Sequence, residues 1–235
     1  MSITSAALPM AAQAMPSAGS DPTELILLYF ILPLWLVAGV ADWFCHRAAN
    51  IERTTGAKES LIHLLMFVEV GLPVLACLFL RINAGVIAVM VVCFFIHELT
   101  ALWDVSYATT ARVVTVLEQH VHSFLEMIPL MAIIAVVALH WPQAAALVGA
   151  GPEAADFSLA WKDTPLPTGY LATVLLVILF FEILPYLEEL WRGWRSAGNR
   201  LMPEAARRAQ AMGTDTLHAT PTVGGRDRLK GVIRP

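Results

Sequence analysis

Charged residues are scarce in this sequence, and their scarcity excludes most classes of soluble protein. Only 14% of the 235 residues are charged and 57% are hydrophobic, with a mean hydropathy of +0.66, whereas soluble domains carry about 25% charged residues. The net charge of −4, with no basic patch, argues against a nucleic-acid partner. Three cysteines (Cys45, Cys77 and Cys93) lie far apart inside apolar runs, which excludes a disulfide framework and a CxxC zinc site. An integral membrane protein remains.

The long hydrophobic runs define the fold class. A bilayer core about 30 Å thick requires roughly 20 apolar residues in helical form, and the runs show no alternation typical of a barrel strand. We therefore predict an all-α, polytopic membrane bundle of five transmembrane helices. The predicted spans are residues 24–47, 59–80, 83–107, 112–140 and 168–191.

The ends of the chain are polar and divide it into three parts. Residues 1–21 lack the basic region and the apolar core of a signal peptide, so we predict a disordered N-terminal tail there. Residues 22–195 form the five-helix transmembrane domain. Residues 196–235 are polar, basic and punctuated by glycine and proline, which predicts a flexible cytoplasmic tail.

The distribution of lysine and arginine predicts the orientation. Thirteen of the fifteen basic residues fall on the side that carries the first loop and the C-terminal tail, and only Arg81 and Lys162 fall on the other. Because basic loops stay in the cytoplasm, we expect the N-terminus outside and the C-terminus inside, in a bacterial inner (plasma) membrane.

Four of the predicted spans each carry one carboxylate and one imidazole, which are costly inside a membrane and therefore candidates for function. The two residues are four apart in three spans and seven apart in the fourth, so each pair shares a helical face. The alternating direction of the helices places all four pairs near the cytoplasmic boundary. The pairs are Asp42 and His46, Glu59 and His63, His97 and Asp104, and Glu118 and His122.

Carboxylates and imidazoles without thiolates suit iron, manganese or zinc, so these eight residues are the predicted metal ligands. The ligand chemistry is similar to that of four-helix di-metal carboxylate proteins, although the spacing differs. We expect two iron ions and an oxidoreductase that hydroxylates or desaturates a lipid-soluble substrate arriving from the bilayer. Glu59 and Glu118 are the candidate catalytic residues. A separate reductase supplies electrons in this interpretation, because the chain contains no flavin or nicotinamide motif.

Further polar residues lie around this set. Glu98, His120 and Glu126 are candidates to support the ligands or to bind metal themselves. Glu69 and Glu182 lie deeper, each four or three residues before a proline, and are candidates for a proton relay or for helix packing. Glu188 and Glu189, with two arginines behind them, are expected to form a solvated helix end.

Other functions fit the same residues. A zinc ion held by three of these histidines and a carboxylate would make the chain an intramembrane hydrolase of lipid amides or esters, with Glu59 or Glu118 as general base. A b-type cytochrome would use His63, His97 or His122 as haem ligands. A metal or proton transporter would use Glu69, Glu126 and Glu182, and a structural subunit of a larger complex would need none of them.

Overall fold

The computed structural model describes residues 21–218, and side chains as far as Met212. Within this part every regular element is a helix, and apart from an isolated bridge between Leu80 and Trp161 there is no strand. The remainder of the two predicted tails, residues 1–20 and 219–235, lies outside the described residues. In chain order the helices are α1 (Pro22–Ile26), η1 (Leu27–Ile31), α2 (Leu32–Ala49), η2 (Ile51–Arg53), α3 (Ala57–Phe79), α4 (Ala84–Ala111), α5 (Val116–Leu139), α6 (Trp141–Leu147), α7 (Thr168–Val177), η3 (Ile178–Ile183), α8 (Leu184–Ser196) and α9 (Glu204–His218).

Five continuous helical spans are long and apolar enough to cross a membrane, as the sequence predicts. They run over Pro22–Ala49, Ala57–Phe79, Ala84–Ala111, Val116–Leu139 and Thr168–Ser196. Large apolar side chains such as Leu99 and Leu102 point outward and are 68% and 67% exposed. Such a surface is stable in lipid and not in water, which indicates an integral membrane protein.

The helix ends follow from local sequence. Asn50 adopts a left-handed conformation (φ 52°) and ends α2 just after its last turn. The Asn83 side chain accepts a hydrogen bond from the backbone N–H of Val86 and so caps α4. Thr115 and Glu118 form a capping box that begins α5. These three ends fix where the polar residues of each span lie.

Two spans contain a wide π-helical turn. The turns η1 and η3 end two residues before Pro33 and Pro185, respectively. Proline has no N–H and its ring displaces the preceding carbonyl, and a π turn accommodates this mismatch without breaking the helix. Glu182 lies inside η3, so the irregular turn determines where this carboxylate points.

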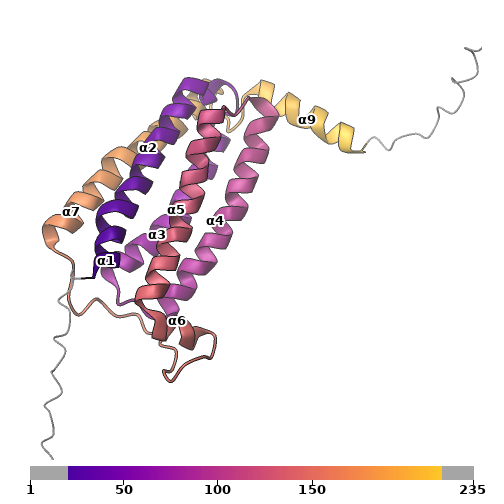
Figure 1. Ribbon diagram of the computed structural model, residues 1–235. Helices are drawn as coiled ribbons and strands as arrows, with labels where there is room; N and C mark the ends of the chain where they lie inside the picture. The colour runs from indigo at the N-terminus through magenta and orange to yellow at the C-terminus, as the bar shows by residue number, and fades with distance from the viewer. Residues whose placement is uncertain (1–20, 219–235) are drawn as a thin grey trace, which may run out of the picture.

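Figure 1 shows the spans as one bundle, with α6 and its loop at one end and α9 extending sideways from the other. We call these the α6 end and the α9 end. The core of the bundle contains Trp35 and Ile128, packed with their neighbours. At the α9 end, α8 approaches α3 so closely that a Cβ on Gly193 would lie 2.8 Å from the Ala57 nitrogen.

Helix α9 lies within the segment predicted to be a flexible tail. The backbone N–H of Lys58 donates to the carbonyl of Leu201 over 2.9 Å, and Ala206 is fully buried. The segment from Leu201 to Ala206 is therefore packed on the α9 end of the bundle.

Candidate metal centre

Polar residues from all five spans converge inside the bundle at its α9 end. The last turns of α2 and α4, the first turns of α3 and α5, and helix α8 all contribute. We call the following ten residues the polar cluster: Asp42, His46, Glu59, His63, Asp104, Arg112, Glu118, His122, Tyr186 and Glu189. Seven of the eight predicted ligands belong to it.

His46 and His63 form the centre of the cluster. Their rings are stacked, with centroids 4.3 Å apart and planes 11° from parallel. Glu189 faces both rings from the same side, with its carboxylate oxygens 3.2 Å from His46 Nδ1 and 3.8 Å from His63 Nδ1. Both Nε2 atoms therefore point away from Glu189, toward the other carboxylates. A carboxylate behind the second nitrogen is the usual support of a metal-binding histidine.

Asp42 links His46 to a third imidazole. One carboxylate oxygen lies 3.2 Å from His46 Nε2, and the other lies 3.0 Å from His122 Nε2. The Tyr186 hydroxyl is 3.3 Å from Asp42 and donates to the carbonyl of Gly39 over 3.0 Å. Asp42, His46 and His122 each offer an atom within 4.8 Å of the others, a spacing that suits a single ion.

Asp104 contacts His63, the second histidine of the stacked pair. Its carboxylate lies 3.1 Å from His63 Nε2, and both side chains are almost completely buried. His46, His63 and Glu59 also offer atoms within 4.8 Å of one another. The two stacked histidines thus face two neighbouring groups of oxygen ligands.

Glu59 and Glu118 are both bound by Arg112. The guanidinium donates to Glu59 over 2.5 Å and also bonds to Glu118, while Glu118 caps α5 and lies 3.8 Å from His46 Nε2. Burial alone would lower the pKa of Arg112, but its hydrogen bonds to Glu118 and Glu59 outweigh burial and raise that pKa. Arg112 is therefore a permanent cation, and it neutralises part of the charge of this carboxylate pair.

His46 Nδ1 and Glu189 form a hydrogen bond of 3.2 Å, but the contacts on the Nε2 side of His46 and His63 are short without being aligned as hydrogen bonds. His46 Nε2, His63 Nε2 and Asp42 Oδ1 are buried and have no hydrogen-bond partner, although each lies 3.0 to 3.2 Å from a group of the opposite kind. Metal–ligand bonds are about 2.0–2.2 Å long, so neighbouring ligand atoms on one ion lie about 2.8–3.6 Å apart. The distances match ligand atoms that converge on a common point, and buried polar atoms otherwise cost about 1–3 kcal/mol each.

The net charge of the polar cluster also favours the binding of metal ions. Its five carboxylates carry a formal charge of −5 when ionised and Arg112 returns +1, which leaves −4 with neutral imidazoles. Two divalent cations would neutralise the charge. The five carboxylates are Asp42, Glu59, Asp104, Glu118 and Glu189, each at most 3% exposed.

His97, the eighth predicted ligand, lies outside the polar cluster. It is two helical turns, about 10.5 Å, from Asp104 along α4, and its Nδ1 lies 3.8 Å from the Glu69 carboxylate. Glu69 in turn accepts a hydrogen bond of 2.8 Å from the Thr100 hydroxyl. These residues form a separate polar contact deeper in the bundle.

The other predicted residues occupy different environments. Glu182 is 2% exposed and lies directly against Gly39, where a Cβ would be 2.4 Å from its carboxylate. Glu126 lines the small cavity described below, near Glu98 on α4. His120 is exposed and its ring contacts Phe124.

The prediction of a solvated face at Glu188 and Glu189 is wrong for Glu189. Glu189 is completely buried against His46 and His63, whereas Glu188 is partly exposed and pairs with Arg47 at 3.1 Å. Sequence reasoning also missed Tyr186, one turn before Glu189. The spacing of these two residues puts them on one face of α8, which was the available signal.

Two cavities adjoin one another inside the bundle. The smaller, about 70 Å³, is lined by apolar side chains and by polar residues both inside and outside the polar cluster: Asp42, His63, His97, Asp104, His122, Glu126, Glu182 and Tyr186. The larger, about 310 Å³, lies toward the α6 end and is mostly apolar, and Trp35 lines both. A metal bound by the polar cluster would thus be next to a space that suits an apolar molecule.

No protein-family model matches the chain, and no curated protein or solved structure is significantly similar to it. The functional argument therefore rests on the geometry of the site.

Proposed function

We propose that this protein is a membrane-embedded enzyme with a two-metal centre that oxidises a lipid-soluble substrate with dioxygen. The observation that carries the proposal is the stacked pair of His46 and His63, both supported by Glu189 and both directed at carboxylates. Two parallel imidazoles 4.3 Å apart suit two ions at nearly the same separation, and two-metal enzymes hold their ions about 3.5–4 Å apart.

The ligands divide into two sets in this proposal. Asp42, His46 and His122 hold one ion, and His63 with Asp104 holds the other. Glu59 lies beside His46 and His63, and Glu118 lies beside His46. Both remain candidates to hold an ion or to accept a proton, in competition with Arg112. The Tyr186 hydroxyl orients the Asp42 carboxylate.

The donor set favours iron as the metal. Imidazole and carboxylate ligands without thiolate suit iron, manganese and zinc, and carboxylates that outnumber histidines on facing helices are the ligand chemistry of four-helix di-iron and di-manganese proteins. Iron supplies the redox chemistry when it is bound. For hydroxylation, a C–H bond, dioxygen, two electrons and two protons give a C–O–H group and water.

The electrons must come from a separate reductase, since the chain has no flavin or nicotinamide motif. We place the α9 end in the cytoplasm of a bacterial cell, because nine of the eleven basic residues in the described part of the chain lie on that side, all but Arg81 and Lys162. A soluble reductase would then dock at the end of the bundle that carries the polar cluster.

A pair of histidines on α5 provides the test. His122→Ala removes a predicted ligand, and His120→Ala removes the exposed imidazole two residues earlier. We expect the purified wild-type protein and His120→Ala, given iron, a chemical reductant and membrane lipids, to consume oxygen and yield lipids that gain one oxygen or lose two hydrogens. We expect His122→Ala to do neither.

The alternatives give different results. Hydrolysed lipid amide or ester in the presence of zinc, without oxygen uptake, would replace the oxidoreductase with a hydrolase. A haem absorption band, or equal activity of the two histidine variants, would contradict the proposed centre.

A further inference from the structure

The loops and helix ends at the α9 end carry an excess of positive charge. Counted over the described residues outside the polar cluster, eight basic residues are accompanied there by three acidic ones, a formal charge of +5. The α6 end carries two basic and five acidic residues, a formal charge of −3. The basic residues of the α9 end are Arg47, Arg53, Lys58, Arg192, Arg195, Arg200, Arg207 and Arg208, and the acidic ones are Glu52, Glu188 and Glu204.

Three exposed arginines of this end lie on elements that are held together. We call Arg53, Arg195 and Arg200 the arginine patch. Helix η2, which contains Arg53, is tied to α8 by the ion pair between Arg192 and Glu52 at 3.0 Å. The loop after α8 carries Arg200 and is hydrogen-bonded to the first turn of α3.

The arginine patch has no acidic partner. Arg47, Arg192 and Arg208 each pair with a glutamate, whereas no ion pair joins the arginine patch to a carboxylate in the described part of the chain. The Arg195 guanidinium lies over the Trp191 ring, 5.2 Å from its centroid, and keeps its charge there. Exposed positive charges without partners attract an acidic surface.

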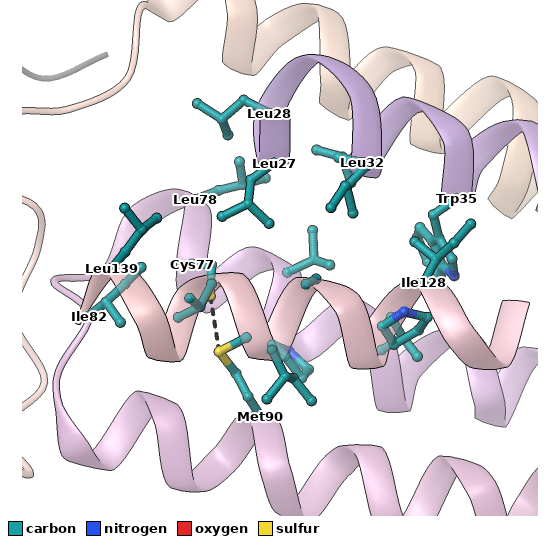
Figure 2. Close-up of a pocket in the computed structure, with 18 of the residues that line it drawn as sticks. Leu27, Leu28, Leu32, Trp35, Cys77, Leu78, Ile82, Met90, Ile128 and Leu139 are labelled. Atoms are coloured by element: carbon teal, nitrogen blue, oxygen red, sulfur yellow. Dashed lines mark hydrogen bonds between the residues drawn. The ribbon is translucent and has the colours of Figure 1, made fainter. Parts of the chain in front are cut away.

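The polar cluster lies close to this end of the bundle. His46 is three residues from the end of α2 and Glu59 is two residues from the start of α3, about 4.5 Å and 3 Å along the helix axes. From the α6 end, Asp42 lies twenty residues beyond Pro22, about 30 Å along the helix, and the larger cavity with the aliphatic wall shown in Figure 2 lies on that side. Because electron transfer between proteins slows steeply with distance, a soluble donor has to bind at the α9 end.

We propose that the arginine patch is the docking site of a soluble electron donor that presents an acidic surface. The partner is acidic because the charges of the patch are unpaired, and it is soluble because the patch lies at or beyond the ends of the spans. The inference rests on the proposed function in naming the partner an electron donor. For each C–H bond hydroxylated, the donor is oxidised by two electrons, which pass to dioxygen at the metal centre.

Flavodoxin, a small acidic electron carrier, is the probe for this site. The protein is reconstituted in nanodiscs of zwitterionic lipid, which leave both ends accessible, and is titrated with fluorescently labelled flavodoxin. We expect saturable binding at about 10 mM salt that weakens about tenfold or more at about 150 mM, because the Debye length falls from about 30 Å to about 8 Å.

Two double variants with the same change in net charge locate the binding. Arg53→Glu with Arg200→Glu reverses two charges of the arginine patch, whereas Arg81→Glu with Lys162→Glu reverses two at the α6 end. We expect the first to weaken flavodoxin binding about tenfold or more at low salt and the second to leave it unchanged. Flavodoxin-driven lipid oxidation should follow the same order, while a small chemical reductant, which needs no docking, should not distinguish the two.

Three results would overturn the inference: no saturable binding of flavodoxin, equal losses in the two double variants, or equally tight binding of the basic protein cytochrome c. Binding to anionic vesicles that the patch variant loses, without binding of flavodoxin, would assign the patch to lipid head groups instead. Flavodoxin binding by a protein that takes up no metal would leave a docking site for an acidic protein and refute the two-metal enzyme. An active enzyme whose flavodoxin binding is the same in the patch variant would refute only the docking site.

Discussion

The substitution Glu189→Gln tests most directly whether the Glu189 carboxylate supports metal binding by His46 and His63. Gln has nearly the same shape as Glu and can still accept a hydrogen bond, but it removes the negative charge that faces both Nδ1 atoms at 3.2 and 3.8 Å. The two imidazoles then become weaker donors to a metal and are less firmly oriented.

The expected size follows from the role of such carboxylates. Replacing a group that supports a metal ligand typically weakens metal binding by about 10–100-fold, which is about 1.4–2.7 kcal/mol. Because Glu189 supports two ligands and not one, we expect the upper part of this range. Thermal unfolding of the metal-free protein should change far less than metal affinity.

Titration with a fluorescent chelator, on protein in detergent or nanodiscs, measures the affinity. Glu188→Gln is the matched control, since the neighbouring side chain is partly exposed and pairs with Arg47 and Arg192. Equal metal affinity in wild type and Glu189→Gln, or equal losses in both variants, would refute the assigned role of Glu189.

Three further predictions concern the ligands and the packing around them. Asp104→Asn should reduce the metal content from about two ions per chain to about one, measured by elemental analysis, because Asp104 serves only the His63 side of the pair. Arg112→Gln should destabilise the folded protein by about 3–5 kcal/mol, read from thermal or denaturant unfolding, because it leaves two buried carboxylates without their cation. Gly193→Ala should cost about 1–3 kcal/mol in the same assay, since the new Cβ would meet the backbone of α3 at 2.8 Å, while Gly169→Ala meets nothing within 4 Å.

The fold and much of the polar cluster were predictable from local spacing. Short loops force successive spans to run antiparallel, so the C-terminal turn of α2 and the N-terminal turn of α3 must meet. The i, i+4 pairs Asp42–His46 and Glu59–His63 therefore lie at one level. His97 shows the limit of this reasoning, because residues seven apart share a face but differ in depth by about 10.5 Å.

Residues of the fifth span were beyond such reasoning. Because the connection between α6 and α7 (residues 148–167) is long, the sequence does not determine where the fifth span lies around the bundle. The packing of α8 against α3 brings Glu189 to the histidines. Glu118 is a different case. The pattern from Thr115 to Glu118 is a capping box readable in the sequence, and Arg112 lies just before it.

The amount of metal in the wild-type protein tests the central claim most directly. After purification in detergent and incubation with iron, manganese or zinc followed by removal of loosely bound ions, elemental analysis should find about two ions per chain, and fewer in His63→Ala. A folded protein that retains no metal under any of these conditions would contradict the account and would leave the polar cluster as a network of ion pairs.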